Sequence, residues 1–376
     1  MRNYIFLEKN MDDPLLSDTR QIQQALDACM EEGGEVVLGP GSWQISSLRL
    51  YSHTTLRLKS GAHITASQQY EDYIDFAFES TLRYLKSPYI CRLWHLPPDY
   101  LKACITAVDA EDVAVIGELG TSIDGCNCQN PMGEEGFHGP MGMVFCRCKQ
   151  VTLRGYTIMR SGNWSHQLDS CEDVLIDDVR IRGGHDGVAL HHCWGVRIEH
   201  CDFRTGGHCV AGYDAENVYV RQCFFNTPCC GFKIGAVNLQ IESCRFWGPG
   251  EYPHPLTGRH NTLHAIDYYS FDFDDCRPSK NWIITDCSFE DLDSLFDINY
   301  GNNWEHNGSP LLSLKMENCS FSGIREGSII CSKEPMTVSF SHIRGSFKDG
   351  IPESGVCETS PQVTFQLRDV SIFGLT

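Results

Sequence analysis

A short motif that recurs along the chain, with its first clear copies 22 and 21 residues apart, is the feature that most limits what this chain can fold into. The motif reads apolar-x-apolar-x-x-Cys-x-Phe, and its alternation predicts a short β-strand. A repeat of about 22 residues fits one coil of a parallel β-helix with three short strands, and each coil buries its inner face only by stacking on the next. The clear copies carry Cys201, Cys223, Cys244, Cys287 and Cys319, and a divergent copy that begins at Val174 carries Val179 instead.

The cysteines of this motif are predicted to form an internal ladder of small side chains. Free cysteine is among the most buried residue types, whereas ligands in one straight row could not surround a metal ion tetrahedrally. The chain has 20 cysteines, but the segment Met1 to Lys9 shows neither a long apolar stretch nor a small-residue cleavage site. These observations predict a cytoplasmic protein with reduced thiols.

The charge balance limits the partners. There are 30 Lys and Arg residues against 49 Asp and Glu residues, which gives a formal net charge of −19 with neutral histidines. Such a surface repels nucleic-acid phosphates and anionic lipid, and no run of 18 or more apolar residues is present to cross a bilayer. We therefore expect neither nucleic acid nor a membrane as a partner. A polyanionic sugar would require a local basic patch.

One domain that covers residues 1–376 is expected, because no Pro/Gly/Ser-rich linker divides the chain. Residues from about 68 to 100 and from about 248 to 277 break the period, and we predict that they form loop excursions from the coil. Walker A, dinucleotide-binding and His-Glu-x-x-His motifs are absent from the sequence. The favoured expectation is therefore no cofactor and no metal ion.

Residues 1–34 are predicted to cap the N-terminal end of the solenoid. Within them a helix from Arg20 to about Glu32 is expected, with an N-cap at Asp18-Thr19 and an end at Gly33-Gly34. A helix in this place would cover the exposed edge of the first coil.

Several segments along the chain match one family in order and spacing. They are Ser17 to Gly34, Val36 to Gly41, Ile123-Asp124-Gly125 and Ser161-Gly162-Asn163-Trp164. On these residues the chain resembles the polygalacturonase-like glycoside hydrolases of family 28. The resemblance covers most of the chain, and it implies an all-β, single-stranded, right-handed parallel β-helix with a short N-terminal capping helix.

The catalytic motifs of that family are altered here. Its members carry Asn-x-Asp-Gly, then Gly-Asp-Asp one coil later, then His-Gly and Arg-x-Lys. The resemblance places Gly184 to Gly187, Gly206-Gly207-His208, Cys230-Gly231 and His264 to Asp267 at those positions. Asp186 keeps a carboxylate, but the Gly-Asp-Asp pair and the Arg-x-Lys clamp for a uronate are replaced. Because an inverting glycosidase needs an acid and a carboxylate base, a non-standard catalytic centre is implied.

Asp186, His208 and Cys230 follow one another at intervals of 22 residues, which predicts stacking on adjacent coils about 4.8 Å apart. An Asp that orients a His beside a Cys can produce a tuned acid or base, or a thiolate. Two alternatives remain at this point. One is a metal site completed by His185, His191 or His192, and the other is an Asp186 that makes only turn hydrogen bonds beside Gly187.

The expected roles follow from these positions. Asp186 would act as base or stabiliser, His208 as acid/base partner, and Asp267 as a replacement acid or sugar contact. Carboxylates mixed with aromatic residues after Asp267 fit a saccharide cleft. The residues expected to bind substrate are His185, Cys230, Lys233, His264 and Trp304.

The leading function is hydrolysis of a glycosidic bond in an oligosaccharide from pectin or a related plant polysaccharide. Two alternatives come from other classes: a lyase or epimerase on the same scaffold, in which His208 would abstract a proton, and a non-catalytic carbohydrate-binding protein. An oligosaccharide is the expected partner. An exposed solenoid end would permit a homo-oligomer, although no residue demands one.

Overall fold

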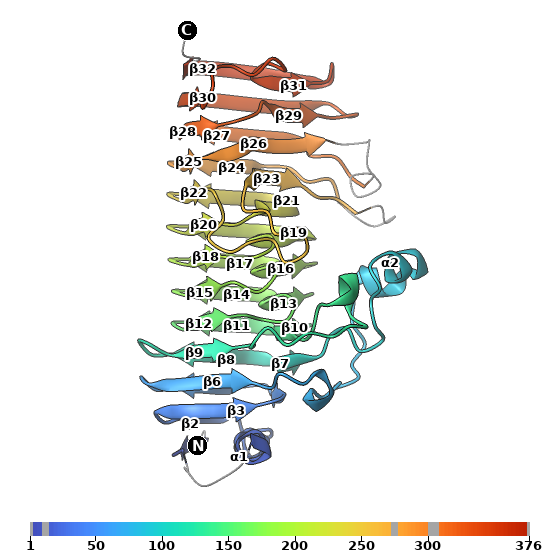
Figure 1. Cartoon of the computed structure of the whole chain (residues 1–376), viewed down its shortest axis with the longest axis vertical. Coiled ribbons are helices and arrows are strands. Elements are labelled where there is room, and N and C mark those ends of the chain that lie inside the picture. Colours follow the sequence, from blue (N-terminus) through green and yellow to red (C-terminus); the bar gives the residue numbers. More distant parts are fainter. Residues whose placement is uncertain (1–2, 10–14, 272–276, 300–307, 374–376) are drawn as a thin grey trace. The chain divides into compact units, whose positions relative to one another are not determined.

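The computed structural model describes residues 3–9, 15–271, 277–299 and 308–373. The chain forms two compact units, Met1–Ala189 and Leu190–Thr376, which we call the N-terminal and the C-terminal unit. The division falls inside strand β16 (Val188–His191). Short parallel strands make up most of each unit (Figure 1), so the predicted all-β class is confirmed. A single continuous domain stays a prediction.

The N-terminal unit is built of three-stranded coils. β10 pairs in parallel with β7 and β13, β11 pairs with β8 and β14, and β12 pairs with β9 and β15, so three ladders run along the unit. Its helical elements are α1 (Leu15–Ala28), η1 (Tyr70–Asp72), η2 (Arg83–Lys86), α2 (Pro88–Leu93) and η3 (Glu134–Gly136). Its strands are β1 (Asn3–Leu7), β2 (Gly34–Leu38), β3 (Gly41–Ile45), β4 (Leu48–Leu50), β5 (Thr54–Leu58), β6 (Ala62–Ala66), β7 (Ala103–Val108), β8 (Glu111–Gly117), β9 (Ser122–Asp124), β10 (Met141–Cys146), β11 (Lys149–Arg154), β12 (Thr157–Met159), β13 (His166–Asp169), β14 (Glu172–Asp177) and β15 (Arg180–Arg182).

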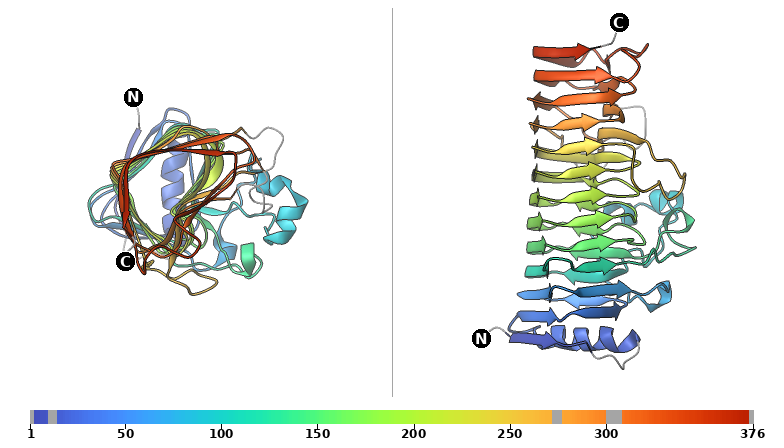
Figure 2. Two further views of the ribbon diagram at one scale, coloured as in Figure 1. Left: turned by 90° about the horizontal axis from the view of Figure 1, so that it is seen from above. Right: turned by 60° about the vertical axis from the view of Figure 1, so that its left-hand side comes forward.

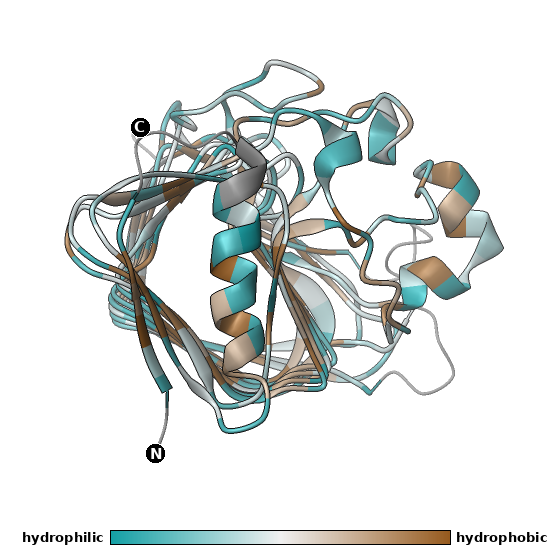
Figure 3. Ribbon diagram, turned by 90° about the horizontal axis from the view of Figure 1, so that it is seen from below, coloured by the Kyte–Doolittle hydropathy of each residue, from teal (hydrophilic) through white to brown (hydrophobic). Residues whose placement is uncertain are grey.

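Helix α1 covers the first coil, packed against β2, β3 and β4 (Figure 3). Ile22 and Leu26 on its inner face are fully buried. The helix begins before the predicted Arg20 and ends at Ala28, so the expected N-cap at Asp18-Thr19 is wrong. The Asp18 carboxylate instead accepts hydrogen bonds from Lys9 Nζ at 2.6 Å and from the backbone N–H of Gln44 at 2.8 Å, and it thereby ties the helix to β3.

The segment between β6 and β7 leaves the coil and contains η1, η2 and α2 (Figure 1). Helix α2 begins where its sequence favours a helix start, because Ser87 Oγ accepts a hydrogen bond from the Ile90 N–H at 3.3 Å and Pro88 occupies the first turn.

The C-terminal unit is built of the same type of coil. β19 pairs in parallel with β21, β21 with β23 and β24, and β23 with β26. After β16 the strands are β17 (Trp194–Glu199), β18 (Asp202–Arg204), β19 (Val210–Arg221), β20 (Phe224–Asn226), β21 (Cys230–Glu242), β22 (Arg245–Trp247), β23 (Thr262–Tyr268), β24 (Trp282–Thr285), β25 (Ser288–Glu290), β26 (Leu292–Asn299), β27 (Ser313–Glu317), β28 (Ser320–Ile324), β29 (Ser328–Cys331), β30 (Met336–Phe347), β31 (Cys357–Thr359) and β32 (Val363–Phe373).

The recurring motif forms a sharp bend followed by a buried thiol. The residue before each ladder cysteine has a positive φ between 52° and 55°, which turns the chain between two strands. The ladder cysteines are buried, as predicted, and none of them is joined in a disulfide. Successive rungs touch, since the Cys201 N–H lies 3.4 Å from Cys223 Sγ and the Cys244 N–H lies 3.4 Å from Cys287 Sγ.

A row of phenylalanines fills the inside of the same coils. The rings of Phe203, Phe225, Phe246 and Phe289 stack at centroid distances of 5.1, 4.7 and 5.0 Å, with the planes tilted by 26° or less. Figure 2 shows the strands of successive coils stacked within each unit. Each coil therefore supplies the wall against which the next one packs.

The predicted excursion at residues 248–277 is interrupted by a strand. Strand β23 lies inside this range and is part of the coil, because it pairs with β21 and β26. Among the described residues of the range, the loop at 248–261 leaves the coil before this strand. Among the described residues, no helix is long and apolar enough to span a bilayer.

The phenylalanine row generates a stability prediction. Phe225→Ala should lower the free energy of unfolding by about 3–5 kcal/mol, because it opens a cavity between two stacked rings. Its neighbour Phe224 is 48% exposed, and Phe224→Ala should change stability by only about 0.5 kcal/mol. Urea denaturation followed by circular dichroism measures both, and equal losses for the two variants would contradict the stacking argument.

Candidate functional site

Two columns of polar side chains cross β21, β23 and β26 in the C-terminal unit. In the first, the strand register pairs Lys233 with Asp267 and Asp267 with Asp297. Parallel pairing holds such residues about 4.8 Å apart along the column. The second column consists of Cys230, His264 and Ser294.

Asp267 lies at the centre of this cluster and is only 7% exposed. Its Oδ2 lies 3.7 Å from Lys233 Nζ and 4.0 Å from Cys230 Sγ. The Lys233 ammonium also lies 5.4 Å from the ring centroid of Tyr269. A cation beside a largely buried carboxylate stabilises its negative charge. Asp267 is thus held in a polar environment of a kind that a hydrophobic core does not provide.

His264 links the two columns. Its Nδ1 lies 2.8 Å from Ser294 Oγ, and its Nε2 lies 3.7 Å from Asp297 Oδ2. Burial lowers the pKa of His264, and the nearby Asp297 carboxylate opposes this effect. Asp297 therefore adds a second carboxylate to the cluster, one coil beyond Asp267.

His208 enters the cluster through the backbone of β21. The Cys230 N–H donates to His208 Nδ1 at 3.3 Å, so in the neutral ring the proton is on Nε2. Burial, followed by the positive charges of Lys233, His254, Arg259 and His264, holds the pKa of His208 well below its usual range. At neutral pH His208 is therefore an uncharged donor through its Nε2–H.

Cys230 is buried, with 1% of its surface exposed. Burial and then the charge of Asp267 raise the pKa of its thiol well above the usual range. A thiolate nucleophile at this position is therefore disfavoured. The backbone N–H of Cys230 holds His208, and its sulfur contacts Asp267. In this structure its side chain is almost completely covered, so it stabilises the cluster and exposes almost no surface to a ligand.

Two cationic side chains, Lys233 and Arg259, act on this cluster beside its carboxylates, although the protein carries a net charge of −19. Arg259 and His254 belong to the loop at residues 248–261, and both act electrostatically on His208 together with Lys233. Arg259 is fixed there because its Nε donates to the Pro228 carbonyl at 3.0 Å. A loop that departs from the coil thus brings cationic groups to the polar columns.

In the N-terminal unit, Asp186 and His185 follow a turn made by Gly183 and Gly184, whose φ angles are +65° and +71°. The Asp186 carbonyl accepts a hydrogen bond from the Ser165 N–H at 2.8 Å, so the backbone at Asp186 is anchored to the start of β13. The Asp186 carboxylate is nearly buried, and its Oδ1 lies 3.8 Å from His185 Nδ1. Its stacking on His208 stays a prediction.

The sequence analysis identified most of the C-terminal cluster but not all of it. The structure brings His208, Cys230, Lys233, His264 and Asp267 together, and Trp304 lies outside the described residues. Asp297 and Ser294 were missed. They follow their partners Asp267 and His264 by 30 residues, and this longer interval conceals the coil period of about 22 residues.

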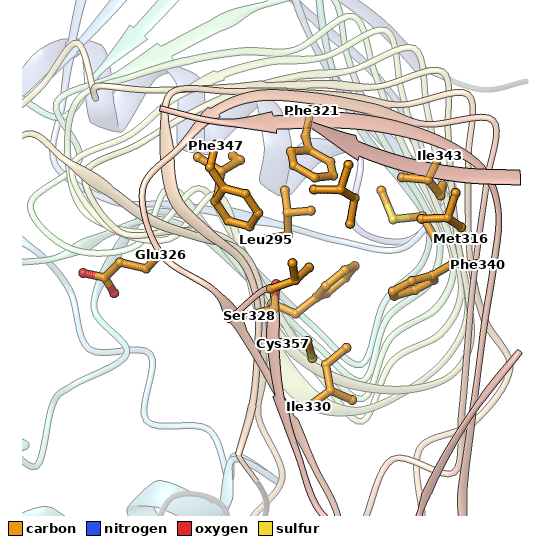
Figure 4. A pocket seen from close by; sticks show the side chains of 15 residues that line it. Leu295, Met316, Phe321, Glu326, Ser328, Ile330, Phe340, Ile343, Phe347 and Cys357 are labelled. Atoms are coloured by element: carbon orange, nitrogen blue, oxygen red, sulfur yellow. The ribbon is translucent and has the colours of Figure 1, made fainter. Parts of the chain in front are cut away.

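An enclosed space farther along the C-terminal unit does not belong to this cluster. It is an apolar cavity of about 50 Å³. Phe321, Phe340, Phe347 and Met316 line it, while the Glu326 carboxylate at its edge points away from the rings (Figure 4). A sugar needs several converging polar groups, so the polar columns, not this cavity, are the candidate site.

The depressed pKa of His208 generates a pH prediction. At a pH above about 6.5, the usual pKa of histidine, the His208 ring is neutral in both the folded and the unfolded state. At a lower pH the unfolded state takes up a proton on this ring, whereas the folded state does not, because its pKa is depressed. Stability should therefore fall with decreasing pH. Between about pH 7.5 and about pH 5 the His208→Asn variant should lose less stability than the unaltered protein, by up to about 2 kcal/mol. Chemical denaturation at both pH values measures this, and a pH-independent difference would refute the neutral-imidazole assignment.

Known proteins support the polygalacturonase-like resemblance. Over 203 residues, half of the chain, it is 26% identical to a curated relative from Vitis vinifera named "Probable polygalacturonase", of which it spans 39%. It superimposes on an exopolygalacturonase from Thermotoga maritima with a TM-score of 0.72 and 16% identity, covering 98% of this chain and 91% of that one. It also superimposes on a family 28 exopolygalacturonase from Yersinia enterocolitica with a TM-score of 0.68 and 14% identity, covering 100% of this chain and 76% of that one. The model of the right-handed beta helix region matches residues 142–342, and the chain therefore belongs to the right-handed β-helix family.

Proposed function

We propose that this protein hydrolyses a glycosidic bond in an oligosaccharide derived from pectin or a related plant polysaccharide, with a non-standard catalytic centre. The observation that carries the proposal is the column of Lys233, Asp267 and Asp297 on a polygalacturonase-like coil. Glycosidases work with a pair of carboxylates, one of which protonates the leaving oxygen while the other serves the attacking water or the sugar. Asp267 and Asp297 supply such a pair on adjacent strands.

The other polar groups have separate tasks in this proposal. His208 donates its Nε2–H to a sugar oxygen or to the leaving group, because its Nδ1 is engaged by the Cys230 N–H. His264 positions Asp297 through their 3.7 Å contact. In the N-terminal unit, Asp186 keeps its proposed role as base or stabiliser. His185 keeps its proposed role as a substrate contact.

The cations favour an acidic sugar as the substrate. Lys233 and Arg259 both act on His208 in a protein whose overall charge would repel a uronate. A carboxylate on the substrate would be attracted to this local positive charge and would find a charge-assisted hydrogen bond at Lys233. The family's Arg-x-Lys clamp is absent, so these residues would replace it.

The hydrolysis is tested by incubating the protein with a mixed library of pectic and hemicellulosic oligosaccharides in heavy-oxygen water. Mass spectrometry should show a product that gains one heavy oxygen. Asp267→Asn should lower kcat/KM by at least about 100-fold, because it removes a general acid or base, and Asp186→Asn should also lower it. The exposed Asp286→Asn serves as the matched control and should leave the rate unchanged.

The same experiment separates the alternatives. An unsaturated product without heavy oxygen would replace hydrolysis by a lyase reaction. Saccharide binding without any product would show a non-catalytic carbohydrate-binding protein. Full activity of Asp267→Asn would remove that residue from the mechanism.

The preference for an acidic sugar has its own test. Lys233→Gln should raise KM for uronate-containing oligosaccharides by about 10- to 100-fold, which corresponds to the loss of one hydrogen bond to a charged group. Neutral oligosaccharides should show little change. Lys280→Gln, an exposed lysine of the same unit, is the control. An equal effect on acidic and neutral substrates would contradict a charge contact at Lys233.

A further inference from the structure

Three potential metal ligands converge in the N-terminal unit. They are Glu135, His138 and His185, and each offers one ligand atom within 4.8 Å of the others. Glu135 and His138 belong to the loop that contains η3, whereas His185 follows β15. The rings of His138 and His185 lie 4.2 Å apart between centroids. Residues nearly 50 positions apart in the chain are thus brought to one place.

The loop that carries Glu135 and His138 is held in position before any ligand arrives. His138 pairs with Gln129 in an isolated antiparallel bridge, and the Glu135 N–H donates to the Trp94 carbonyl at 3.0 Å, which places the loop beside α2 (Figure 1). Gly133 has no room for a side chain, because a Cβ there would lie 1.9 Å from the His138 carbonyl oxygen. Preorganisation of this kind lowers the entropic cost of binding a ligand.

The hydrogen bonding of His138 leaves one ring nitrogen for a cation. Its side chain is 1% exposed, and its Nδ1 lies 3.4 Å from the Gly162 carbonyl oxygen. A carbonyl can only accept, so Nδ1 carries the proton and Nε2 presents a lone pair in the neutral ring. In metal-binding histidines, the ring nitrogen that does not bind the metal usually donates a hydrogen bond to a carboxylate, a backbone carbonyl or a water.

That lone pair faces a carboxylate. Nε2 of His138 lies 3.3 Å from Oε2 of Glu135, so this contact needs either a proton on Nε2 or a metal ion in place of that proton. His185 also lies near a carboxylate, with its Nδ1 at 3.8 Å from Asp186 Oδ1. The buried Glu134 lies in the same loop. A divalent cation would bind both imidazoles and offset the carboxylates around them.

From this geometry we propose that Glu135, His138 and His185 form a binding site for a divalent transition-metal ion of the Zn²⁺ type. Two imidazoles and one carboxylate suit zinc, whereas calcium and magnesium prefer all-oxygen sites. Ligand atoms of a tetrahedral zinc ion lie about 3.4 Å apart, so small side-chain rotations complete the site. Three protein ligands leave a fourth position for water.

The bound ion would join the η3 loop to the coil. Its ligand His185 is adjacent to Asp186, so the metal would also fix the backbone that presents this carboxylate. The site does not depend on the proposed hydrolysis, because it is defined by metal binding alone.

Isothermal titration of untagged, metal-free protein with Zn²⁺, under a reducing agent that does not bind zinc, tests the proposal. The unaltered protein should bind one ion more than His138→Ala and His185→Ala, or bind it more than about 100-fold more tightly, since loss of an outer-shell partner alone costs 10- to 100-fold. Glu135→Gln alters an exposed side chain and should weaken binding without affecting folding. His63→Ala, an exposed histidine of the same unit, should bind as the unaltered protein does.

Substitution with Co²⁺ distinguishes this site from adventitious binding by the many thiols. Its visible spectrum should show imidazole and carboxylate ligation that disappears in the His138, His185 and Glu135 variants, and Zn²⁺ should raise Tm in the unaltered protein but not in Glu135→Gln. Identical zinc stoichiometry and affinity in Glu135→Gln and the unaltered protein would overturn the proposal. A Co²⁺ spectrum that shows thiolate ligation alone and is identical in every variant would do the same.

Discussion

The stacking of inward-facing side chains, coil upon coil, is the interaction on which each unit depends. A single three-stranded coil has no opposing layer, so its apolar residues are buried only by the coils above and below. The stacked rings from Phe203 to Phe289 and the contact between Cys201 and Cys223 are examples of this packing between coils. On the coil that contains β2, β3 and β4, α1 takes over the covering role with Ile22 and Leu26.

The same stacking gives the site its geometry. Because the strands of adjacent coils stay in parallel register, a polar residue on one strand has a fixed neighbour on the next. Lys233, Asp267 and Asp297 are such neighbours, and their backbone positions are held by the core beneath them. A catalytic arrangement on rigid strands needs little reorganisation when a substrate binds. The segments that leave the coil add what the strands lack, namely Arg259 beside one polar cluster and His138 beside another.

Electrostatics in the C-terminal cluster follows from burial more than from net charge. The overall charge of −19 lies mostly on the outside, whereas the low pKa of His208 and the high pKa of the Cys230 thiol show that charged forms of both side chains are disfavoured inside. His208 is thus a neutral donor, and Cys230 is a thiol. The idea of an activated cysteine, which the spacing of Asp186, His208 and Cys230 suggested, loses its basis once the desolvation of the sulfur is taken into account.

Regular spacing in the sequence was enough to predict the all-β class, the coil and the buried cysteine ladder, because stacking requires a similar pattern in successive turns. The resemblance to family 28, not the spacing alone, located His208, Cys230, Lys233, His264 and Asp267. The limits of α1 and the place of β23 in the coil were not predictable in this way. Asp18 is used to hold the helix to Lys9 and Gln44, and β23 lies after a loop that interrupts the period. Only the tertiary structure paired Asp267 with Asp297 and brought Glu135 and His138 to His185. These pairings depend on loops of irregular length, and the ends of such loops are positioned by packing on the coil, which leaves no repeating signal in the sequence.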